Sequence, residues 1–252
     1  MKLQPIAVIP VAGVGSRLKP HTHTVPKALI NVAGKPMLAH ILDELLKIGV
    51  HEAVFVVGHM GDRIRDYVES KYKIKAHYVE QPERKGLGHA VYLTRDIVGD
   101  RPTLIVLGDT IFRADFQGVL NAGVSTIGVK EVEDPRRFGV AEVQDGVITK
   151  LVEKPEHPVS RLAVVGIYFI AHGNTLFSAL DTVINEKQQM TKGEFQLTDA
   201  LELMIQRGEK LGVFPVDGWY DCGKTETLLA TNRDLLDMDG KSTEIEGSVI
   251  LA

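Results

Sequence analysis

The first residues in this chain that could do chemistry lie in a loop with two glycines and an arginine. An apolar run at residues 6–9 leads into residues 10–18, where Gly13, Gly15 and Arg17 occur within five positions. Glycine lets backbone N–H groups approach an anion closely, because no Cβ atom stands in the way. Residues 1–42 contain five lysines and arginines, among them Lys27, and no acidic residue. The pattern favours an anion-binding site, with a chance distribution of surface charge as the alternative.

Two familiar nucleotide-binding patterns fit this sequence poorly. A dinucleotide fingerprint would need a third glycine where the loop has Leu18, and an acidic residue near position 33, where there is none. Residues 218–225 match the P-loop pattern literally. Trp219, Tyr220 and Asp221 are, however, bulky or negatively charged where that loop would wrap a phosphate. We therefore reject both patterns and keep Asp221 as a candidate side chain.

Two aspartates are candidate magnesium ligands. Asp109 follows Gly108 at the end of a buried-type strand, at the edge where parallel α/β sheets bind ligands. Asp221 precedes a helical pattern near the end of the chain. Two carboxylates that converge on phosphates suit Mg²⁺, which prefers few carboxylates together with substrate oxygens. A turn aspartate that accepts backbone N–H groups is the alternative for each.

Length and composition restrict the class of protein. The chain has 252 residues, one cysteine and a net charge of −4. One cysteine excludes an internal disulfide and a Cys-only zinc site, and the negative charge argues against nucleic-acid binding. The apolar runs are far shorter than the roughly 20 residues that span a bilayer, and the first residues do not resemble a signal peptide. We expect a cytoplasmic protein that binds neither nucleic acid nor membrane.

Alternating strands and helices must position the loop and Asp109. Over residues 1–120, apolar runs of strand length alternate with amphipathic helical patterns. We expect strands at 6–9, 53–57, 74–79 and 103–107, and helices at 36–49, 62–72 and 89–98. This alternation predicts a parallel sheet covered by helices on both faces.

The second half of the chain has a different character. We expect strands at 126–132, 140–143, 147–153 and 164–170, followed by helices at 175–185, 197–207 and 225–236. Some of these strands are antiparallel, since Asp145-Gly146 favours a hairpin turn. The prediction is one α/β domain with a mixed, mainly parallel sheet over residues 1–240, and a short C-terminal extension at residues 241–252.

Seven motifs resemble, in order, those of the sugar-1-phosphate nucleotidyltransferases. The loop reads Val11-Ala-Gly-Val-Gly-Ser-Arg-Leu-Lys-Pro and is followed by Pro26-Lys27. The other motifs are Gln81-Pro82 with Gly86-Leu-Gly-His-Ala, Gly108-Asp109, Phe138-Gly139-Val140, Glu153-Lys154-Pro155, Val165-Gly166-Ile167-Tyr168 and Trp219-Tyr220-Asp221-Cys222-Gly223. Within the family, glucose-1-phosphate thymidylyltransferases and UTP–glucose-1-phosphate uridylyltransferases are the most similar.

The resemblance implies a Rossmann-like nucleotidyltransferase (GT-A-like) fold and a Mg²⁺-assisted transfer. A phosphate oxygen of a hexose 1-phosphate, expected to be glucose 1-phosphate, would attack the α-phosphorus of dTTP or UTP. Pyrophosphate would leave and a nucleotide-sugar would form. The base stays open, because Ala12 and residues 86–90 resemble UTP users whereas Gln81 and Asp109 lie in motifs of the thymidylyl type. Residues 245–250 resemble the start of the left-handed β-helix of longer relatives.

The resemblance also implies roles for individual residues. Arg17 and Lys27 are the expected catalytic residues, acting at the pyrophosphate and at the α-phosphate. The residues expected to bind the nucleotide are Ala12, Gly13, Gly15, Ser16, Gln81, Gly86 and Asp109. The residues expected to bind the sugar phosphate are Gly139, Glu153, Lys154, Val164 and Lys192. Asp109 and Asp221 are the expected Mg²⁺ ligands.

Other functions remain open at this point. A protein of the same fold could bind a nucleotide-sugar without turnover, although such a sensor would have no reason to keep two metal ligands. Mannose 1-phosphate with GTP, or N-acetylglucosamine 1-phosphate with UTP, are alternative substrate pairs. A homo-oligomer is compatible with each of these functions.

Overall fold

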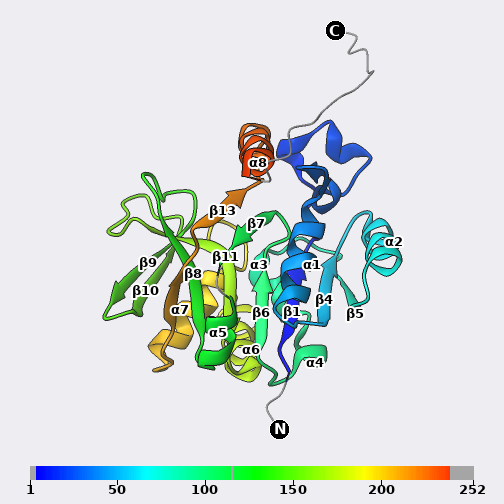
Figure 1. The fold of residues 1–252 in the computed structure, drawn as a ribbon. Helices are drawn as coiled ribbons and strands as arrows, with labels where there is room; N and C mark the ends of the chain where they lie inside the picture. Colours follow the sequence, from blue (N-terminus) through cyan, green and yellow to red (C-terminus); the bar gives the residue numbers. More distant parts are fainter. Residues whose placement is uncertain (1–3, 115, 239–252) are drawn as a thin grey trace, which may run out of the picture.

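The computed structural model describes residues 4–114 and 116–238 of the chain. The extension expected at residues 241–252, with its resemblance to a β-helix, lies outside the described residues. The described chain forms a nine-stranded sheet with helices on both faces (Figure 1). No helix within the described ranges is long and apolar enough to cross a membrane.

The central sheet is mixed, and most of its strands run in one direction. The strand order is β5-β4-β1-β6-β11-β8-β12-β10-β9. Their bounds are β1 Ile6–Pro10, β4 Glu52–Val57, β5 Lys75–Glu80, β6 Thr103–Val106, β8 Thr126–Glu131, β9 Gly139–Gln144, β10 Val147–Glu153, β11 Leu162–Ile170 and β12 Gly212–Pro215. The pairings make β11 and β10 antiparallel to the other seven strands. The predicted α/β fold with a mixed, mainly parallel sheet is confirmed.

The alternating side chains of β1 explain why the sheet needs helices on both faces. Ile6 and Val8 belong to one buried core, and Ala7 and Ile9 belong to the other. Successive strand side chains point to opposite faces, so a strand that is apolar throughout must be covered twice. The helices of the first core are α3 (Leu87–Tyr92), α4 (Arg95–Val98), α6 (Gly173–Asp181) and α7 (Leu197–Gln206), and those of the second are α1 (Met37–Lys47), α2 (Gly61–Lys71) and α5 (Phe116–Ala122).

Two predicted helices are interrupted in the structure. The helix expected at residues 89–98 is divided into α3 and α4. Between them the hydroxyl of Thr94, which is fully buried, donates to the carbonyl oxygen of Val91 at 2.7 Å. Such local bonds compete with the helical pattern, and sequence periodicity does not register them. The helix expected at residues 175–185 begins as α6 and ends in a wider π-helical segment, Thr182–Glu186.

Two short strands missed by the sequence patterns form a separate antiparallel pair. They are β7 (Thr110–Arg113) and β13 (Gly218–Asp221), and α8 (Thr225–Met238) follows the second (Figure 1). The patterns also missed β12, α5 and the small hairpin of β2 (Asn31–Val32) and β3 (Lys35–Pro36). Strands of two to four residues are too short for periodicity to distinguish them from turns. Strand β7 begins directly after Asp109, and strand β13 ends at Asp221, which is paired with Thr110. The pair therefore belongs to the site.

Candidate active site

The candidate site lies at the carboxyl ends of the parallel strands, where two cavities open side by side. β1 ends at Pro10 and continues into the glycine loop, and β6 ends at Val106, just before Asp109. The first cavity, about 420 Å³, is called the glycine-loop cavity, and its lining includes Gly13, Gly15, Ser16, Arg17 and Lys27. The second, about 1060 Å³, is called the Glu153 cavity, and its lining includes Gly139, Glu153, Lys154, Val164, Lys192 and Asp221.

Glycine suits positions 13 and 15 of the loop for different structural reasons. Gly15 adopts a φ of +62°, and a Cβ atom there would lie 2.7 Å from Cγ2 of Thr22 and 3.0 Å from Cβ of Lys27. The hydroxyl of Thr22 donates to the carbonyl oxygen of Gly15 at 2.9 Å, which fastens the loop to this segment. A Cβ atom on Gly13 would meet no atom within 4 Å. Gly13 therefore leaves space in the cavity, whereas Gly15 permits the close approach of Lys27.

Lys27 and Asp109 form an ion pair across the glycine-loop cavity. The Lys27 ammonium contacts the Asp109 carboxylate, and 15% of the lysine side chain and 35% of the aspartate side chain are exposed. The two residues are 82 positions apart in the sequence, on the segment after the loop and on the turn after β6. An ammonium this close to the carboxylate can also neutralise an anion bound beside it.

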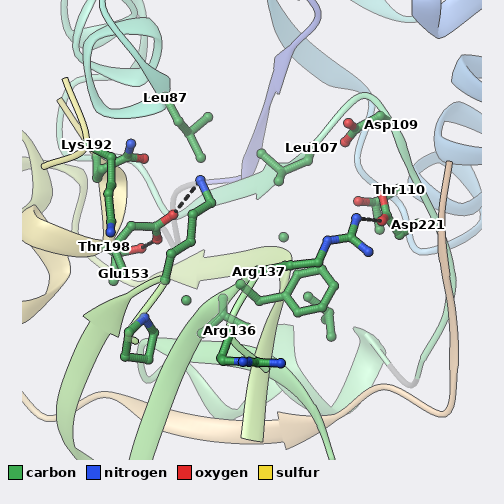
Figure 2. A pocket seen from close by; sticks show the side chains of 18 of the residues that line it. Leu87, Leu107, Asp109, Thr110, Arg136, Arg137, Glu153, Lys192, Thr198 and Asp221 are labelled. Carbon is green, nitrogen blue, oxygen red and sulfur yellow. Dashed lines mark hydrogen bonds and ion pairs between the residues drawn. The ribbon is translucent and has the colours of Figure 1, made fainter. Parts of the chain in front are cut away.

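Glu153 is the most enclosed carboxylate of the second cavity. Only 9% of its side chain is exposed, and it accepts a hydrogen bond of 2.7 Å from the hydroxyl of Thr198 (Figure 2). The Lys154 ammonium lies 3.0 Å from the other carboxylate oxygen. A Cβ atom on Gly139 would lie 3.3 Å from the Thr198 hydroxyl and 3.4 Å from Glu153, so this position favours a small residue. The carboxylate is thus held as an acceptor facing a polar cavity.

Lys154 and Lys192 bring positive charge to the same cavity. Lys154 directly follows β10 and has a φ of +43°, and its backbone N–H donates to the carbonyl oxygen of Phe138 at 3.0 Å. Lys192 is about half exposed and lies 4.0 Å from Glu156. The structure thus places both lysines predicted from the sequence on the cavity that contains Glu153, together with Val164.

The two cavities meet at Asp109. Four residues line both of them: Arg17, Leu87, Leu107 and Asp109. A ligand in the glycine-loop cavity and a ligand in the Glu153 cavity can therefore approach each other beside this carboxylate. The predicted anion-binding loop and the predicted sugar-phosphate residues belong to one continuous site.

Asp109 and Asp221 lie on neighbouring backbone segments. Asp221 is opposite Thr110 in the β7–β13 pair, and the N–H of Cys222 donates to the carbonyl oxygen of Asp109 at 3.1 Å. Both side chains line the Glu153 cavity (Figure 2). Within the described residues no three His, Cys, Asp or Glu side chains gather as a metal site. Two carboxylates fit Mg²⁺ whose other ligands are phosphate oxygens and water.

Three predicted nucleotide residues lie beside these cavities rather than on their walls. Ala12 is buried, and a Cβ atom on Gly58 would lie 3.0 Å from its carbonyl oxygen. Gly86 adopts a φ of +104° and faces the carbonyl oxygen of Phe195, which a Cβ atom would approach to 2.6 Å. Gln81 is 6% exposed and lines a separate polar cavity of about 530 Å³. Their roles in nucleotide binding stay predictions.

The structure adds side chains that sequence reasoning missed. Thr198 holds Glu153, and Arg137 lies at the Glu153 cavity with its guanidinium 3.9 Å from Asp221 (Figure 2). Arg137 directly precedes the Phe138-Gly139 motif, which is the only sequence signal for it. Residues 218–221 of the P-loop match form strand β13, so the rejection of a phosphate loop there is consistent with the structure.

Comparison with known proteins adds an independent observation. The family model described as "Nucleotidyl transferase" matches residues 6–238. The low-salt glycan biosynthesis nucleotidyltransferase Agl11 of Haloferax volcanii is 34% identical over 247 residues, covering 94% of this chain and 67% of that protein. UTP--glucose-1-phosphate uridylyltransferase AglF of the same organism is 32% identical, covering 94% of this chain and 99% of that protein.

A solved structure agrees with both sequence matches. The crystal structure of a putative glucose-1-phosphate thymidylyltransferase from Bacillus anthracis superposes with a TM-score of 0.81 at 30% identity. The alignment covers 92% of this chain and 96% of that chain. The sequence matches and the superposed structure therefore both relate this chain to nucleotidyltransferases.

Proposed function

Because this chain belongs to the nucleotidyl transferase family, we propose that this sugar-1-phosphate nucleotidyltransferase uses UTP or dTTP and a hexose 1-phosphate, with glucose 1-phosphate as the expected acceptor. The products are a nucleotide-sugar and pyrophosphate. The meeting of the two cavities at Asp109 carries this proposal. In this arrangement the triphosphate would occupy one cavity and the sugar phosphate the other. Their phosphates would meet beside Asp109.

On the triphosphate side, the chain supplies N–H groups and two cations. Glycine at positions 13 and 15 lets the loop backbone approach the phosphates. The planar guanidinium of Arg17 suits the departing pyrophosphate, since its fork of donors matches phosphate oxygens. Lys27 neutralises charge at the α-phosphate as it grows in the transition state. Ala12, Ser16, Gln81 and Gly86 complete the proposed nucleotide site.

On the acceptor side, the chain holds a sugar and its phosphate. Glu153 accepts hydrogen bonds from sugar hydroxyls, and Gly139 and Val164 shape the wall beside it. Lys154 and Lys192 bind the phosphate. Positioning of this kind accounts for much of the catalysis in phosphoryl-type transfer, because little covalent work falls to the protein.

In the proposed step, an oxygen of the sugar phosphate forms a bond to the α-phosphorus. The bond from that phosphorus to the bridging oxygen breaks, and its electron pair leaves with pyrophosphate. Asp109 and Asp221 would hold Mg²⁺, which neutralises phosphate charge when it is bound. Lys27 then exchanges its contact with Asp109 for one with the α-phosphate.

The relatives support both pyrimidine nucleotides. One is named for UTP and one solved structure for a thymidylyl group. A sensor without turnover is disfavoured because the chain keeps Lys27, Asp109 and Asp221 around one junction. We therefore retain UTP and dTTP as the two candidate donors.

Pyrophosphate release tests the proposal. Wild-type protein is supplied with Mg²⁺, glucose 1-phosphate and one of UTP, dTTP, ATP, CTP or GTP. Release with UTP or dTTP that is lost in Asp109→Asn supports the proposed reaction. Asp96→Asn is the matched control, since Asp96 on α4 is 83% exposed and lines neither cavity. Activity that persists in Asp109→Asn contradicts the assigned site. If none of the five nucleotides gives pyrophosphate release, glucose 1-phosphate is not the acceptor, and mannose 1-phosphate and N-acetylglucosamine 1-phosphate are assayed in its place.

A further inference from the structure

Arg137 has a loosely held guanidinium beside the acceptor side of the site. Its nearest charged partner is Asp221, at 3.9 Å, which is longer than a hydrogen bond. Within the described residues, Arg137 donates no hydrogen bond from its side chain, 47% of which is exposed. Figure 2 shows the guanidinium extending toward Asp221 and Thr110. A strong donor group is therefore available inside the Glu153 cavity.

The neighbouring arginine is bound differently. Arg136 also lines the Glu153 cavity, but its guanidinium donates twice to the carboxylate of Asp134, at 2.8 and 2.7 Å. These bonds lower the pKa of Asp134 from 3.8 to about 2, so the pair stays charged in mild acid as well as at neutral pH. Two adjacent residues of the same type thus differ in whether their donors are already used.

The backbone that carries Arg137 is anchored to both halves of the acceptor side. The ring of Phe138 packs edge-on against Trp219 of β13, with centroids 5.0 Å apart. The carbonyl oxygen of Phe138 accepts the backbone N–H of Lys154. The first contact ties the segment to the strand that ends at Asp221, and the second ties it to the end of β10. Only the side chain of Arg137 needs to move to reach a ligand.

Charge explains why a further cation is needed here. A sugar phosphate would bring about two negative charges between the carboxylates of Glu153 and Asp221. Lys154 is already paired with Glu153 at 3.0 Å, and Lys192 lies 4.0 Å from Glu156. The fork of an arginine matches phosphate oxygens better than an ammonium does.

We propose that Arg137 binds the phosphate of the sugar 1-phosphate, exchanging its contact with Asp221 for one with the phosphate oxygens. The inference rests on the proposed function, since it assumes that the acceptor occupies the Glu153 cavity. Arg137 lines that cavity and not the glycine-loop cavity. It therefore acts on the acceptor and not on the triphosphate.

Arg137→Ala tests this role, with Arg136→Ala as the matched control on the same segment. Arg137→Ala raises the KM for glucose 1-phosphate about tenfold, as expected for a lost charge-assisted bond, while the KM for the nucleotide changes less than about twofold. Arg137→Lys gives an intermediate KM because it keeps the charge and loses the fork. Arg136→Ala changes both constants less than about twofold.

Calorimetric binding of glucose 1-phosphate, measured for wild type and both alanine variants, separates this inference from the proposed function. Turnover in wild type together with equal effects of the two alanine variants leaves the function standing and overturns the role of Arg137. Equal rises of both KM values in Arg137→Ala overturn it as well. Binding without turnover, weakened only in Arg137→Ala, supports Arg137 and contradicts the reaction. A wild type that binds no sugar phosphate overturns both.

Discussion

The side-chain nitrogen of Gln81 lies 3.1 Å from the carbonyl oxygen of Gly86, and this contact fixes the orientation of the amide. A backbone carbonyl only accepts hydrogen bonds, so the NH₂ end of the amide must face it. The same nitrogen lies 3.1 Å from Nδ1 of His89, which then accepts. Burial lowers the pKa of His89, which keeps the ring neutral and able to accept at neutral pH. The oxygen of Gln81 is left as an acceptor.

An amide held this way discriminates between pyrimidines, if Gln81 reads the base as proposed. Uracil and thymine carry a ring N–H that can donate to the Gln81 oxygen, whereas cytosine has an acceptor there. His89→Leu removes the acceptor that helps to orient the Gln81 amide. It should lower kcat/KM for UTP or dTTP about three- to tenfold and should also reduce the ratio of kcat/KM for UTP to that for CTP. His89→Gln keeps an acceptor and should stay within about twofold. An unchanged UTP-to-CTP ratio in His89→Leu would show that His89 does not orient the amide.

The two loop glycines should respond differently to alanine. Gly15→Ala forces a Cβ atom into a left-handed conformation against Thr22 and Lys27, so we expect a loss of about 1–3 kcal/mol in stability and a strong fall in kcat. Gly13→Ala meets open space and should leave the melting temperature unchanged while raising the KM for the nucleotide. Thermal melts and steady-state kinetics on both variants check this. Equal melting temperatures for the two variants would contradict the assignment.

Thr198 should act through Glu153. Thr198→Val keeps the volume of the side chain and removes the 2.7 Å hydrogen bond to the carboxylate. We expect a rise of about three- to tenfold in the KM for the sugar phosphate, since Glu153 loses its fixed position. Thr198→Ser keeps the hydroxyl and should restore a KM near that of wild type. If the serine variant is as impaired as the valine variant, packing explains the effect and not the hydrogen bond.

Acid should reduce the stability that Glu52, the first residue of β4, contributes to the fold. The Glu52 carboxylate lies 3.0 Å from Arg101, 3.0 Å from His77 and 3.2 Å from Lys75. These contacts, the Arg101 hydrogen bond most strongly, lower the pKa of Glu52 from 4.5 to about 2. The folded pKa lies below the unfolded one, so the stabilisation is present above about pH 4.5 and is lost as the pH falls toward 2.

Urea unfolding of Glu52→Gln measures this contribution. At pH 7 the variant should lose about 1–2 kcal/mol in free energy of unfolding, after allowance for screening by solvent. The difference in free energy of unfolding between this variant and wild type should become smaller as the pH is lowered from 4.5. Glu209→Gln is the control, because Glu209 is exposed and should show little change at either pH. A difference that is constant from pH 7 to pH 3 would contradict the electrostatic explanation.

Local patterns in the chain account for much of the fold. The apolar run that forms β1 and the alternation of strands and helices through the first 120 residues require only nearest-neighbour periodicity, and the structure confirms them. The helices that end or divide early do so for reasons outside that periodicity, as Thr94 shows. Helix α5 and the short strands escaped prediction because they have too few residues to display a period.

The amino-acid sequence identifies the chemical groups of this protein: a glycine loop with Arg17 and Lys27, a carboxylate after β6, and motifs in the order of a known family. Which of these groups come into contact follows from the tertiary structure. Asp109 and Asp221 become neighbours because β7 pairs with β13, and Arg137 reaches Asp221 because Phe138 packs on Trp219. These contacts join segments separated by about 80 to 110 residues. No local pattern encodes such pairings, since they join residues that are far apart in the sequence and meet only when the chain folds.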